Sequence, residues 1–250
     1  MKYPKTKKGL NKSILITGAT SGIGREIAIK FAREGWNIIC HYFSSLKSAK
    51  ELKQEIEKYN VDCRLIGADL SSKRQLMSFI KKVEGLKIDA LVNNAGTYVA
   101  NKYFGKLSID DIEKAFMVNS FSPMLLSSKI FVRMKERNFG RIINISSIAA
   151  KYGGSSYSMH YGCSKRALEG LTKTLAKEGA AYNVLVNTVR PGVIDTEFHR
   201  KFPKDMGKRI KMIPLKRMGT PRDIAEMAYY LGSEKNDFIT NEIITIAGGE

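Results

Sequence analysis

Tyr161 and Lys165 are the two residues of this chain whose types and spacing best suit proton transfer. Residues four apart on a helix share a face, so the phenol and the ammonium point the same way. A tyrosine titrates at about pH 10, and a nearby cation favours the phenolate, which makes a proton donor and acceptor usable near neutral pH. The spacing alone also fits a surface pair with no chemical role. Ser147, a short way upstream, could belong to the same site.

The rest of the chain alternates short apolar runs with amphipathic segments. The apolar runs are rich in Val, Ile and Leu, as expected of strands that are buried on both faces. Predicted strands cover 13–17, 37–42, 64–68, 88–92, 141–146, 184–189 and 243–246, and predicted helices cover 23–34, 45–59, 72–84, 108–136, 157–181 and 221–232. This alternation predicts an α/β fold, a parallel sheet with helices on both faces. A barrel of eight such units is the competing architecture.

The composition suits one compact domain. The chain has 250 residues, 43% of them hydrophobic, and no run approaches the roughly 18 apolar residues of a membrane helix. Three scattered cysteines and few histidines predict a reduced, cytoplasmic protein with no metal site and no membrane partner. Residues 1–12 carry five lysines and no acid, lack the apolar stretch of a secretory signal, and are expected to be a basic flexible tail. The domain is expected to cover residues 13–250.

The net charge of +18 raises the question of nucleic-acid binding. The basic residues are spread along the chain, and aromatic residues are not interleaved with them as a base-stacking platform requires. Lysines on solvated helix faces account for the charge. No nucleic-acid partner is predicted.

A glycine-rich loop, residues 17–24, joins the first predicted strand to the first predicted helix. Gly18, Gly22 and Gly24 allow a tight turn and a close backbone approach, and the start of the helix presents N–H groups to a diphosphate. A structural turn is the alternative, but this position in an alternating chain favours a dinucleotide site. The same loop argues against the barrel.

The end of the second predicted strand bears on the choice between NADP and NAD. NAD enzymes place Asp or Glu there to bond the ribose hydroxyls, whereas residues 41–47 contain no carboxylate. The hydroxyls of this segment, which include Ser44 and Ser45, together with Lys47 and Arg25, could receive a 2′-phosphate. NADP is therefore favoured over NAD. The alternative is that the serines only cap the next helix.

Together these motifs resemble those of the short-chain dehydrogenases/reductases. The resemblance is carried by residues 17–24, Asn93-Asn94-Ala95-Gly96, Asn119, Ser146-Ser147, Tyr161 with Lys165, and Arg190-Pro191-Gly192, in the order of that family. It covers essentially residues 12–250, and the segment 214–249 is most similar to the 3-oxoacyl-(acyl-carrier-protein) reductase branch. The resemblance implies a single-domain, doubly wound Rossmann fold with a seven-stranded parallel sheet.

The resemblance also implies a reaction, the NADPH-dependent reduction of a ketone to a secondary alcohol. Tyr161 would protonate the carbonyl oxygen, and Lys165 would lower the phenol pKa and bond the nicotinamide ribose. Ser147 would hold the carbonyl, although it could instead only end its strand. Asn119 would kink its helix and hold a water that relays protons to the lysine. Because hydride transfer belongs to the cofactor, the protein supplies alignment and electrostatics.

The cofactor contacts implied by the resemblance lie in the loops that follow the strands. Asp69 would bond the adenine amine, Asn93 would line the ribose and support the sheet, and residues 191–196 would close over the nicotinamide. The full set is Gly18, Thr20, Ser21, Gly22, Ile23, Gly24, Tyr42, Ser44, Ser45, Asp69, Leu70, Asn93, Ala95, Gly96, Tyr161, Lys165, Pro191, Gly192, Val193, Ile194 and Thr196.

The substrate is predicted from the segment 197–211, which is a lid in the family and here holds six Lys or Arg against two acids. A basic lid suits an anionic 3-oxoacyl thioester on an acyl carrier protein or CoA, although the overall lysine excess explains it equally well. Met159 and His160 are expected to shape the pocket wall, with His160 packing or hydrogen bonding. The rivals are a sugar, polyol or other small ketone as substrate, and a catalytically silent binding protein. The family also implies a homotetramer.

Overall fold

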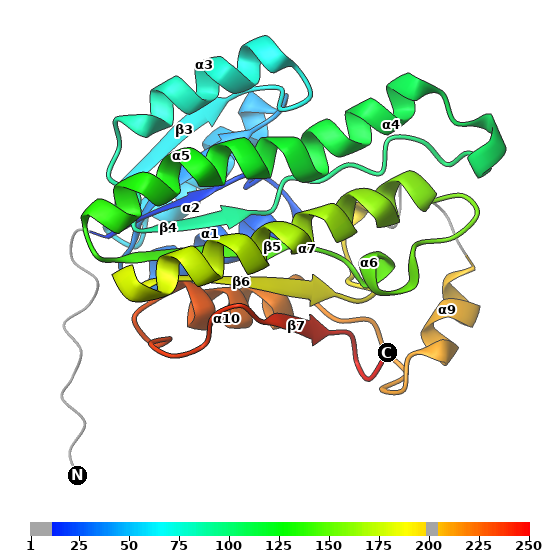
Figure 1. Cartoon of the computed structure of the whole chain (residues 1–250). Helices are drawn as coiled ribbons and strands as arrows, with labels where there is room; N and C mark the ends of the chain where they lie inside the picture. Colours follow the sequence, from blue (N-terminus) through cyan, green and yellow to red (C-terminus); the bar gives the residue numbers. More distant parts are fainter. Residues whose placement is uncertain (1–11, 199–204) are drawn as a thin grey trace.

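A sheet of seven parallel strands lies at the centre of the computed structural model, which describes residues 12–198 and 205–250 (Figure 1). The strands are β1 (Ser13–Ile16), β2 (Asn37–Tyr42), β3 (Cys63–Gly67), β4 (Ala90–Asn93), β5 (Gly140–Ile145), β6 (Val184–Pro191) and β7 (Ile243–Ile246). Their order in the sheet is β3-β2-β1-β4-β5-β6-β7. The chain therefore winds outward from β1 to β3 and then returns to β4 on the other side of β1. The predicted doubly wound, seven-stranded fold is confirmed.

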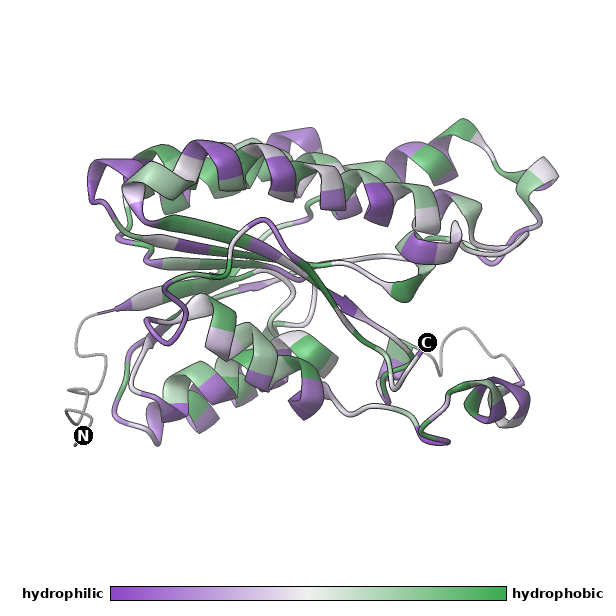
Figure 2. Cartoon of the chain, turned by 60° about the horizontal axis from the view of Figure 1, so that its bottom comes forward, coloured by the Kyte–Doolittle hydropathy of each residue, from purple (hydrophilic) through white to green (hydrophobic). Residues whose placement is uncertain are grey.

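Helices cover both faces of this sheet, which Figure 2 shows between two helical layers. They are α1 (Gly22–Arg33), α2 (Leu46–Glu57), α3 (Lys73–Glu84), α4 (Ile109–Phe116), α5 (Ser122–Glu136), α6 (Ile148–Tyr152), α7 (Met159–Gly179), α9 (Met206–Met212) and α10 (Pro221–Gly232), with the short turns η1 (Phe104–Lys106), η2 (Met117–Phe121) and η3 (Ala180–Tyr182). Helices α1, α2 and α10 pack on one face, and α3, α5 and α7 pack on the other.

The core forms two apolar layers because successive strand residues point to opposite faces. Ile14 and Ile16 of β1 join the layer under α1, α2 and α10, and Leu15 joins the layer under α3 and α5. Capping boxes at Ser108 and Thr220 fix the starts of α4 and α10. The start predicted at 221 is therefore explained by the Thr220 cap and by proline at the first helical position.

The predicted helix 108–136 is continuous but not uniform. Between α4 and α5 the residues Met117–Phe121 form a π-helical turn, which often marks a functional site. The run Ile109–Glu136 is long and apolar enough to span a membrane by length and composition, and 56% of its most apolar window is buried inside the structure. Its packing against the sheet as part of the helical layer accounts for that apolar character.

Two helices were absent from the sequence prediction. Helix α6 has five residues, too few to give a periodic pattern. Helix α9 lies in the basic segment predicted as a lid, of which residues 199–204 fall outside the described part of the chain. Lys12, predicted as part of the tail, is held by an ion pair with Glu234 and by contact with the Phe139 ring. Residues 1–11 lie outside the described residues.

Candidate active site

The backbone conformation of the glycine-rich loop accounts for glycine at positions 18, 22 and 24. Gly18 and Gly22 have φ of 64° and 50°, in the left-handed region that side chains disfavour. At Gly24, an added Cβ would lie 2.3 Å from the Gly18 carbonyl oxygen. Ser21 occupies the N-cap of α1, and its side chain forms no capping bond. The first-turn N–H groups are therefore available to an anion, as predicted.

Asn94 supports this loop from the end of β4. Its side-chain amide donates to the carbonyl oxygens of Thr17 and Gly18 at 2.9 and 3.0 Å, and the Thr17 hydroxyl accepts from the backbone N–H of Asn94 and of Ala95, each at 3.0 Å. In the sequence, Asn94 was identified only as part of a motif. The structure assigns it to the shape of the loop.

The neighbouring residue Asn93 is buried inside the sheet, with 1% of its surface exposed. Its amide donates to Ser127 at 2.9 Å and to Asn144 at 2.8 Å, and Asn144 in turn donates to Thr172. The predicted support of the sheet agrees with these bonds. The side-chain oxygen of Asn93 is buried without a hydrogen-bond partner, and the predicted contact of Asn93 with the ribose stays a prediction.

The segment after β2 has mixed roles. The Ser45 hydroxyl accepts from the Ser48 N–H at 3.2 Å and caps α2, while its predicted contact with a 2′-phosphate stays a prediction. Ser44 is exposed, and the Tyr42 ring packs over Gly67, where an added Cβ would lie 2.8 Å from the ring. Arg25 forms an ion pair with Glu55 of α2.

The loop after β3 holds the two predicted adenine contacts. Asp69 Oδ1 accepts from the N–H and the hydroxyl of Ser71 at 2.8 and 2.7 Å. Leu70 is 5% exposed and belongs to the core, while its carbonyl accepts from Ser122 at 2.8 Å. Asp69 thus stabilises the turn before α3, and the buried Leu70 side chain packs beneath that turn.

The loop after β6 lies beside the glycine loop. An added Cβ at Gly22 would lie 3.2 Å from Thr196 Cγ2, which brings the two predicted cofactor loops together. Val193 and Ile194 are 5% and 3% exposed, and Gly219 exchanges backbone hydrogen bonds with Val193 and Asp195. Pro191 ends β6, and the Gly192 N–H donates to the Ile246 carbonyl at 2.9 Å. These bonds fix residues 191–196 at the carboxyl edge of the sheet.

The four predicted catalytic residues come from three parts of the fold. Asn119 lies in the π turn η2, Ser147 follows β5 and caps α6, and Tyr161 and Lys165 lie one turn apart on α7. The Ser147 hydroxyl accepts from the Ala149 N–H at 3.2 Å, and it lies near enough to the half-buried Tyr161 phenol to lower the pKa of that phenol. Ser147 therefore does more than end its strand, and it faces the residue predicted as the proton donor.

Asn119 is fully buried and uses both ends of its amide. Oδ1 accepts from the Thr97 N–H at 2.8 Å, and Nδ2 donates to the Thr97 carbonyl and the Ser164 hydroxyl, each at 2.9 Å. These bonds tie the π turn to the loop after β4 and to α7. Asn119 thus lies in a π-helical turn, and the predicted kink and water relay stay predictions.

Lys165 is 2% exposed, and its Nζ donates to the Ile145 carbonyl at 2.8 Å. Burial lowers the pKa of Lys165 to about 8, opposed by the charge of Glu169. Burial raises the pKa of Tyr161 to about 12, and the nearby Ser147 hydroxyl opposes this only in part. The net shift of the phenol pKa is therefore upward, because removal from water has the larger effect, and the predicted lowering by Lys165 stays a prediction.

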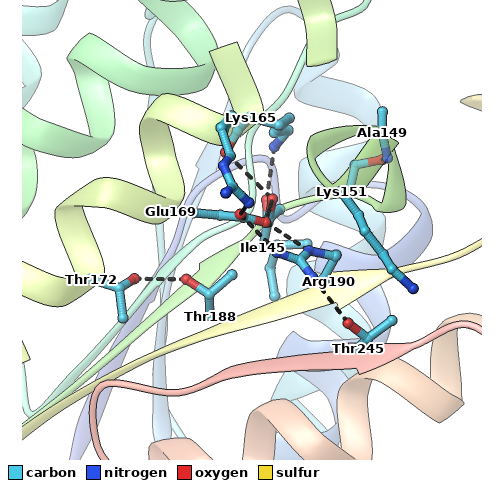
Figure 3. A network of polar contacts seen from close by, with 12 residues as sticks. Ile145, Ala149, Lys151, Lys165, Glu169, Thr172, Thr188, Arg190 and Thr245 are labelled. Carbon is cyan, nitrogen blue, oxygen red and sulfur yellow. Dashed lines mark hydrogen bonds and ion pairs between the residues drawn. The ribbon is translucent and has the colours of Figure 1, made fainter. Parts of the chain in front are cut away.

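Glu169, one turn beyond Lys165, is the centre of a buried polar network (Figure 3). Its carboxylate accepts from Arg190 Nε and Nη2, each at 2.8 Å, and from the Ser146 hydroxyl at 2.8 Å. The side chain of Glu169 is 3% exposed. One carboxylate thus joins α7 to the ends of β5 and β6, the strands that lead to Ser147 and to the loop 191–196.

Tyr98 was not predicted from the sequence, because it lies in a loop, where no periodic pattern indicates a buried residue. It is 3% exposed, its ring centroid lies 5.7 Å from that of Tyr161, and its hydroxyl donates to the Tyr157 carbonyl at 2.8 Å. Phe198 lies beside both rings, with its centroid 5.9 Å from that of Tyr161 and 6.1 Å from that of Tyr98. His160 Nε2 lies 2.6 Å from the Tyr98 carbonyl oxygen, which confirms the predicted hydrogen-bonding role of His160.

All of these loops follow the carboxyl ends of the strands, where doubly wound sheets bind their ligands. Among residues 12–198 and 205–250, no three His, Cys, Asp or Glu side chains lie close enough to hold a metal ion. The arrangement offers a diphosphate-binding turn at one end and a serine, a phenol and an ammonium at the other. It can bind a dinucleotide and exchange a proton with a carbonyl oxygen.

Known proteins match this chain over nearly its whole length. Residues 18–250 match the protein family described as Enoyl-(Acyl carrier protein) reductase. The chain is 37% identical to the 3-oxoacyl-(acyl-carrier-protein) reductase FabG of Aquifex aeolicus, over 95% of this chain and 96% of that protein. It is 34% identical to the L-rhamnose 1-dehydrogenase (NADP(+)) of Thermoplasma acidophilum, over 95% of both. A 3-oxoacyl (acyl-carrier-protein) reductase from Agrobacterium tumefaciens C58, solved with NADP bound, has a TM-score of 0.90, 26% identity and full coverage of both chains.

Proposed function

Since the chain belongs to the short-chain dehydrogenase/reductase family of oxidoreductases, we propose that it uses NADPH to reduce a 3-oxoacyl thioester to a secondary alcohol. The observation that carries the proposal is the proximity of the Ser147 hydroxyl to the Tyr161 phenol, with Lys165 one turn further along α7. A carbonyl oxygen that meets both hydroxyls would be oriented and protonated at one point.

The residues beside this point fit a nicotinamide dinucleotide. An added Cβ at Gly24 would lie 2.3 Å from the Gly18 carbonyl oxygen, and one at Gly96 would lie 3.2 Å from Lys165 Nζ. Glycine therefore leaves this space open at both positions. The start of α1 presents N–H groups for the diphosphate, and Thr196 lies beside Gly22. When bound, the dinucleotide supplies the hydride.

The protonation states of the site suit reduction. With a pKa of about 12, Tyr161 is a neutral phenol at pH 7 and can give its proton to the carbonyl oxygen. With a pKa of about 8, Lys165 is mostly protonated at pH 7, and its charge stabilises the phenolate that Tyr161 becomes. Ser147 holds the carbonyl oxygen during the transfer.

The preference for NADPH over NADH rests on the segment after β2. It contains no carboxylate at residues 41–47, and Ser44 and Lys47 are exposed beside it. Arg25 lies nearby in a partly exposed ion pair with Glu55, a kind of pair that contributes little to stability and is easily exchanged. A 2′-phosphate would meet hydroxyls and cations there instead of an acid.

The thioester is favoured over a sugar by the wall around the phenol. Tyr98 and Phe198 pack beside the Tyr161 ring and against each other, and they offer apolar surface that an acyl chain can cover. A sugar or polyol is the second candidate, because a similar protein at 34% identity is an L-rhamnose 1-dehydrogenase. The segment 205–211 and α9 keep the basic character predicted for the lid, although Arg209 is paired with Glu250.

The proposal includes a homotetramer. Helix α5 and the turn before it expose apolar side chains, with Phe121 45%, Leu125 42% and Val132 54% exposed, and Phe238 before β7 is 93% exposed. Exposed apolar surface of this extent is typical of protein interfaces. A catalytically silent protein is disfavoured, since Asn119, Ser147, Tyr161 and Lys165 are all present.

The test compares the oxidation of NADPH by the purified protein with acetoacetyl-CoA and with cyclic ketones, and the reduction of NADP+ with L-rhamnose and polyols, and is repeated with NADH and NAD+. Turnover with the thioester and NADPH supports the proposal. Turnover only with sugars replaces the thioester with the second candidate. Binding of DNA without turnover of any ketone would support the silent protein.

A further inference from the structure

His41 lies on β2 at the edge of the proposed dinucleotide site, and no step of the proposed reaction uses it. Its side chain is almost fully buried, with 2% exposed, and its ring packs on Phe79 of α3 at a centroid distance of 4.9 Å. A buried imidazole needs partners for its two nitrogens. His41 has one partner on each nitrogen.

These two partners define the tautomer. The Gly18 N–H donates to His41 Nδ1 at 3.1 Å, and His41 Nε2 lies 3.0 Å from the Ala68 carbonyl oxygen. A carbonyl oxygen cannot donate, so Nε2 carries the proton, and an N–H cannot accept, so Nδ1 is bare. Burial lowers the pKa of His41 to about 4, which keeps this neutral form at pH 7.

The imidazole therefore connects two loops of the site. Gly18 opens the glycine loop with φ of 64°, and Ala68 precedes Asp69 after β3. The backbone adds parallel bonds, from the Ala19 N–H to the His41 carbonyl at 2.9 Å and from the Ala68 N–H to the Tyr42 carbonyl at 3.0 Å. His41 is the side-chain link in a connection from the glycine loop across β2 to the loop after β3.

We propose that His41 is a positioning residue for the dinucleotide, and that its bare Nδ1 holds the Gly18 peptide in the orientation that the diphosphate-binding turn requires. This inference rests on the proposed function only in assuming that the site binds NADPH. The Gly18 N–H is consumed by His41 and does not meet the diphosphate itself. The Ala19 N–H is also used, by the His41 carbonyl, so the diphosphate would be bound by later N–H groups of the loop and by the first turn of α1, whose placement depends on the Gly18 peptide.

Two substitutions separate this role from simple space filling. In His41→Asn the amide oxygen can take the place of Nδ1 and accept from Gly18, whereas in His41→Gln the amide nitrogen can take the place of Nε2 and donate to Ala68. We expect the Kd for NADPH to stay within about threefold of wild type in His41→Asn and to rise about tenfold in His41→Gln, where the Gly18 N–H loses its acceptor. Space filling predicts the reverse order, because Gln is closer to His in volume.

The binding measurement is calorimetric titration of the whole protein with NADPH, alongside kcat at saturating NADPH, which we expect to change less than twofold. Ile39→Ala is the matched control, because Ile39 lies two residues earlier on the same face of β2 and is 6% exposed. It should lower Tm and leave the Kd unchanged. Equal affinities of the Asn and Gln variants, or tighter binding by the Gln variant, overturn the inference.

A measurement on the wild-type protein covers the case in which the variants do not fold. Nitrogen-15 NMR of the imidazole should show the neutral tautomer with the proton on Nε2 at pH 7. A proton on Nδ1 overturns the inference, since Gly18 would then have no acceptor. Absence of any NADPH binding by the wild type would instead contradict the proposed function.

Discussion

Lys165 Nζ donates to the carbonyl oxygen of Ile145 at 2.8 Å, at the end of the strand that leads into Ser147. A buried ammonium is thereby fixed between the helix that carries Tyr161 and the strand that delivers the serine. The hydrogen bond to Ile145 fixes the position of the ammonium. Burial disfavours its charged form and lowers the pKa of Lys165 to about 8. The first two predictions follow from this pair.

The rate of ketone reduction should fall as the pH rises through about 8. Lys165 loses its proton there, and its charge no longer stabilises the phenolate, whereas Tyr161, with a pKa of about 12, keeps its proton. The measurement is kcat/KM for the ketone from pH 6 to 10. A rate that stays flat to pH 10 would show that the charge of Lys165 is not needed.

Lys165→Met should abolish turnover and stabilise the fold at pH 7. The pKa of Lys165 is lower in the folded protein than the 10.5 of the free side chain, so the unfolded state binds the proton more tightly. This penalty, about 3 kcal/mol, is full below pH 8 and disappears as the pH rises through 10.5. Because Ile145 loses its donor, we expect a net gain of about 1–2 kcal/mol. Denaturant unfolding at pH 7 and 10 measures it, and a loss of stability at pH 7 would contradict the account.

Gly96→Ala should reduce activity more than stability. The added Cβ would lie 3.2 Å from Lys165 Nζ and 3.4 Å from Asn119 Oδ1, so it would press on two of the four catalytic residues. We expect kcat to fall about tenfold or more, with a change in unfolding free energy of about 1 kcal/mol. Gly170→Ala on α7 is the matched control, because an added Cβ there meets nothing within 4 Å. That variant should be fully active and slightly more stable.

Glu169→Gln should weaken both the fold and the chemistry. The carboxylate is buried, and its removal leaves Arg190 without its charged partner, which costs about 3 kcal/mol. Because the charge of Glu169 raises the pKa of Lys165, the alkaline fall in kcat/KM should also move to lower pH. Glu136→Gln, in an exposed pair with Arg133, is the control and should change neither quantity. An unchanged pH profile in Glu169→Gln would limit the role of Glu169 to stability.

The sequence predicted the elements and the catalytic spacing because both depend on local periodicity. Tyr161 and Lys165 share a face of α7 wherever that helix lies, and the glycine loop is recognisable from the residues between β1 and α1. The direction of the phenol pKa shift was not predictable, because it depends on how much protein surrounds Tyr161. The burial of Asn93 depends on its partner Asn144, and the pairing of Glu169 with Arg190 depends on the packing of α7 against β6.

The roles of Tyr98 and His41 were also not predictable from the sequence. Tyr98 lies in a loop and His41 in an apolar strand, and neither position indicates a functional role. Their roles come from residues far away in the chain, since Tyr98 contacts Tyr161 and His41 accepts from Gly18. Such contacts are defined by the order of the strands and by the helix layer above them, which a single sequence does not display.

The central claim is that Tyr161 donates the proton in an NADPH-dependent reduction of a 3-oxoacyl thioester. The most direct measurement is the oxidation of NADPH with acetoacetyl-CoA by the wild-type protein and by Tyr161→Phe, which removes only the hydroxyl. The account predicts turnover by the wild type, a loss of at least about a thousandfold in the variant, and nearly unchanged binding of NADPH. Turnover by Tyr161→Phe within about tenfold of wild type would contradict it.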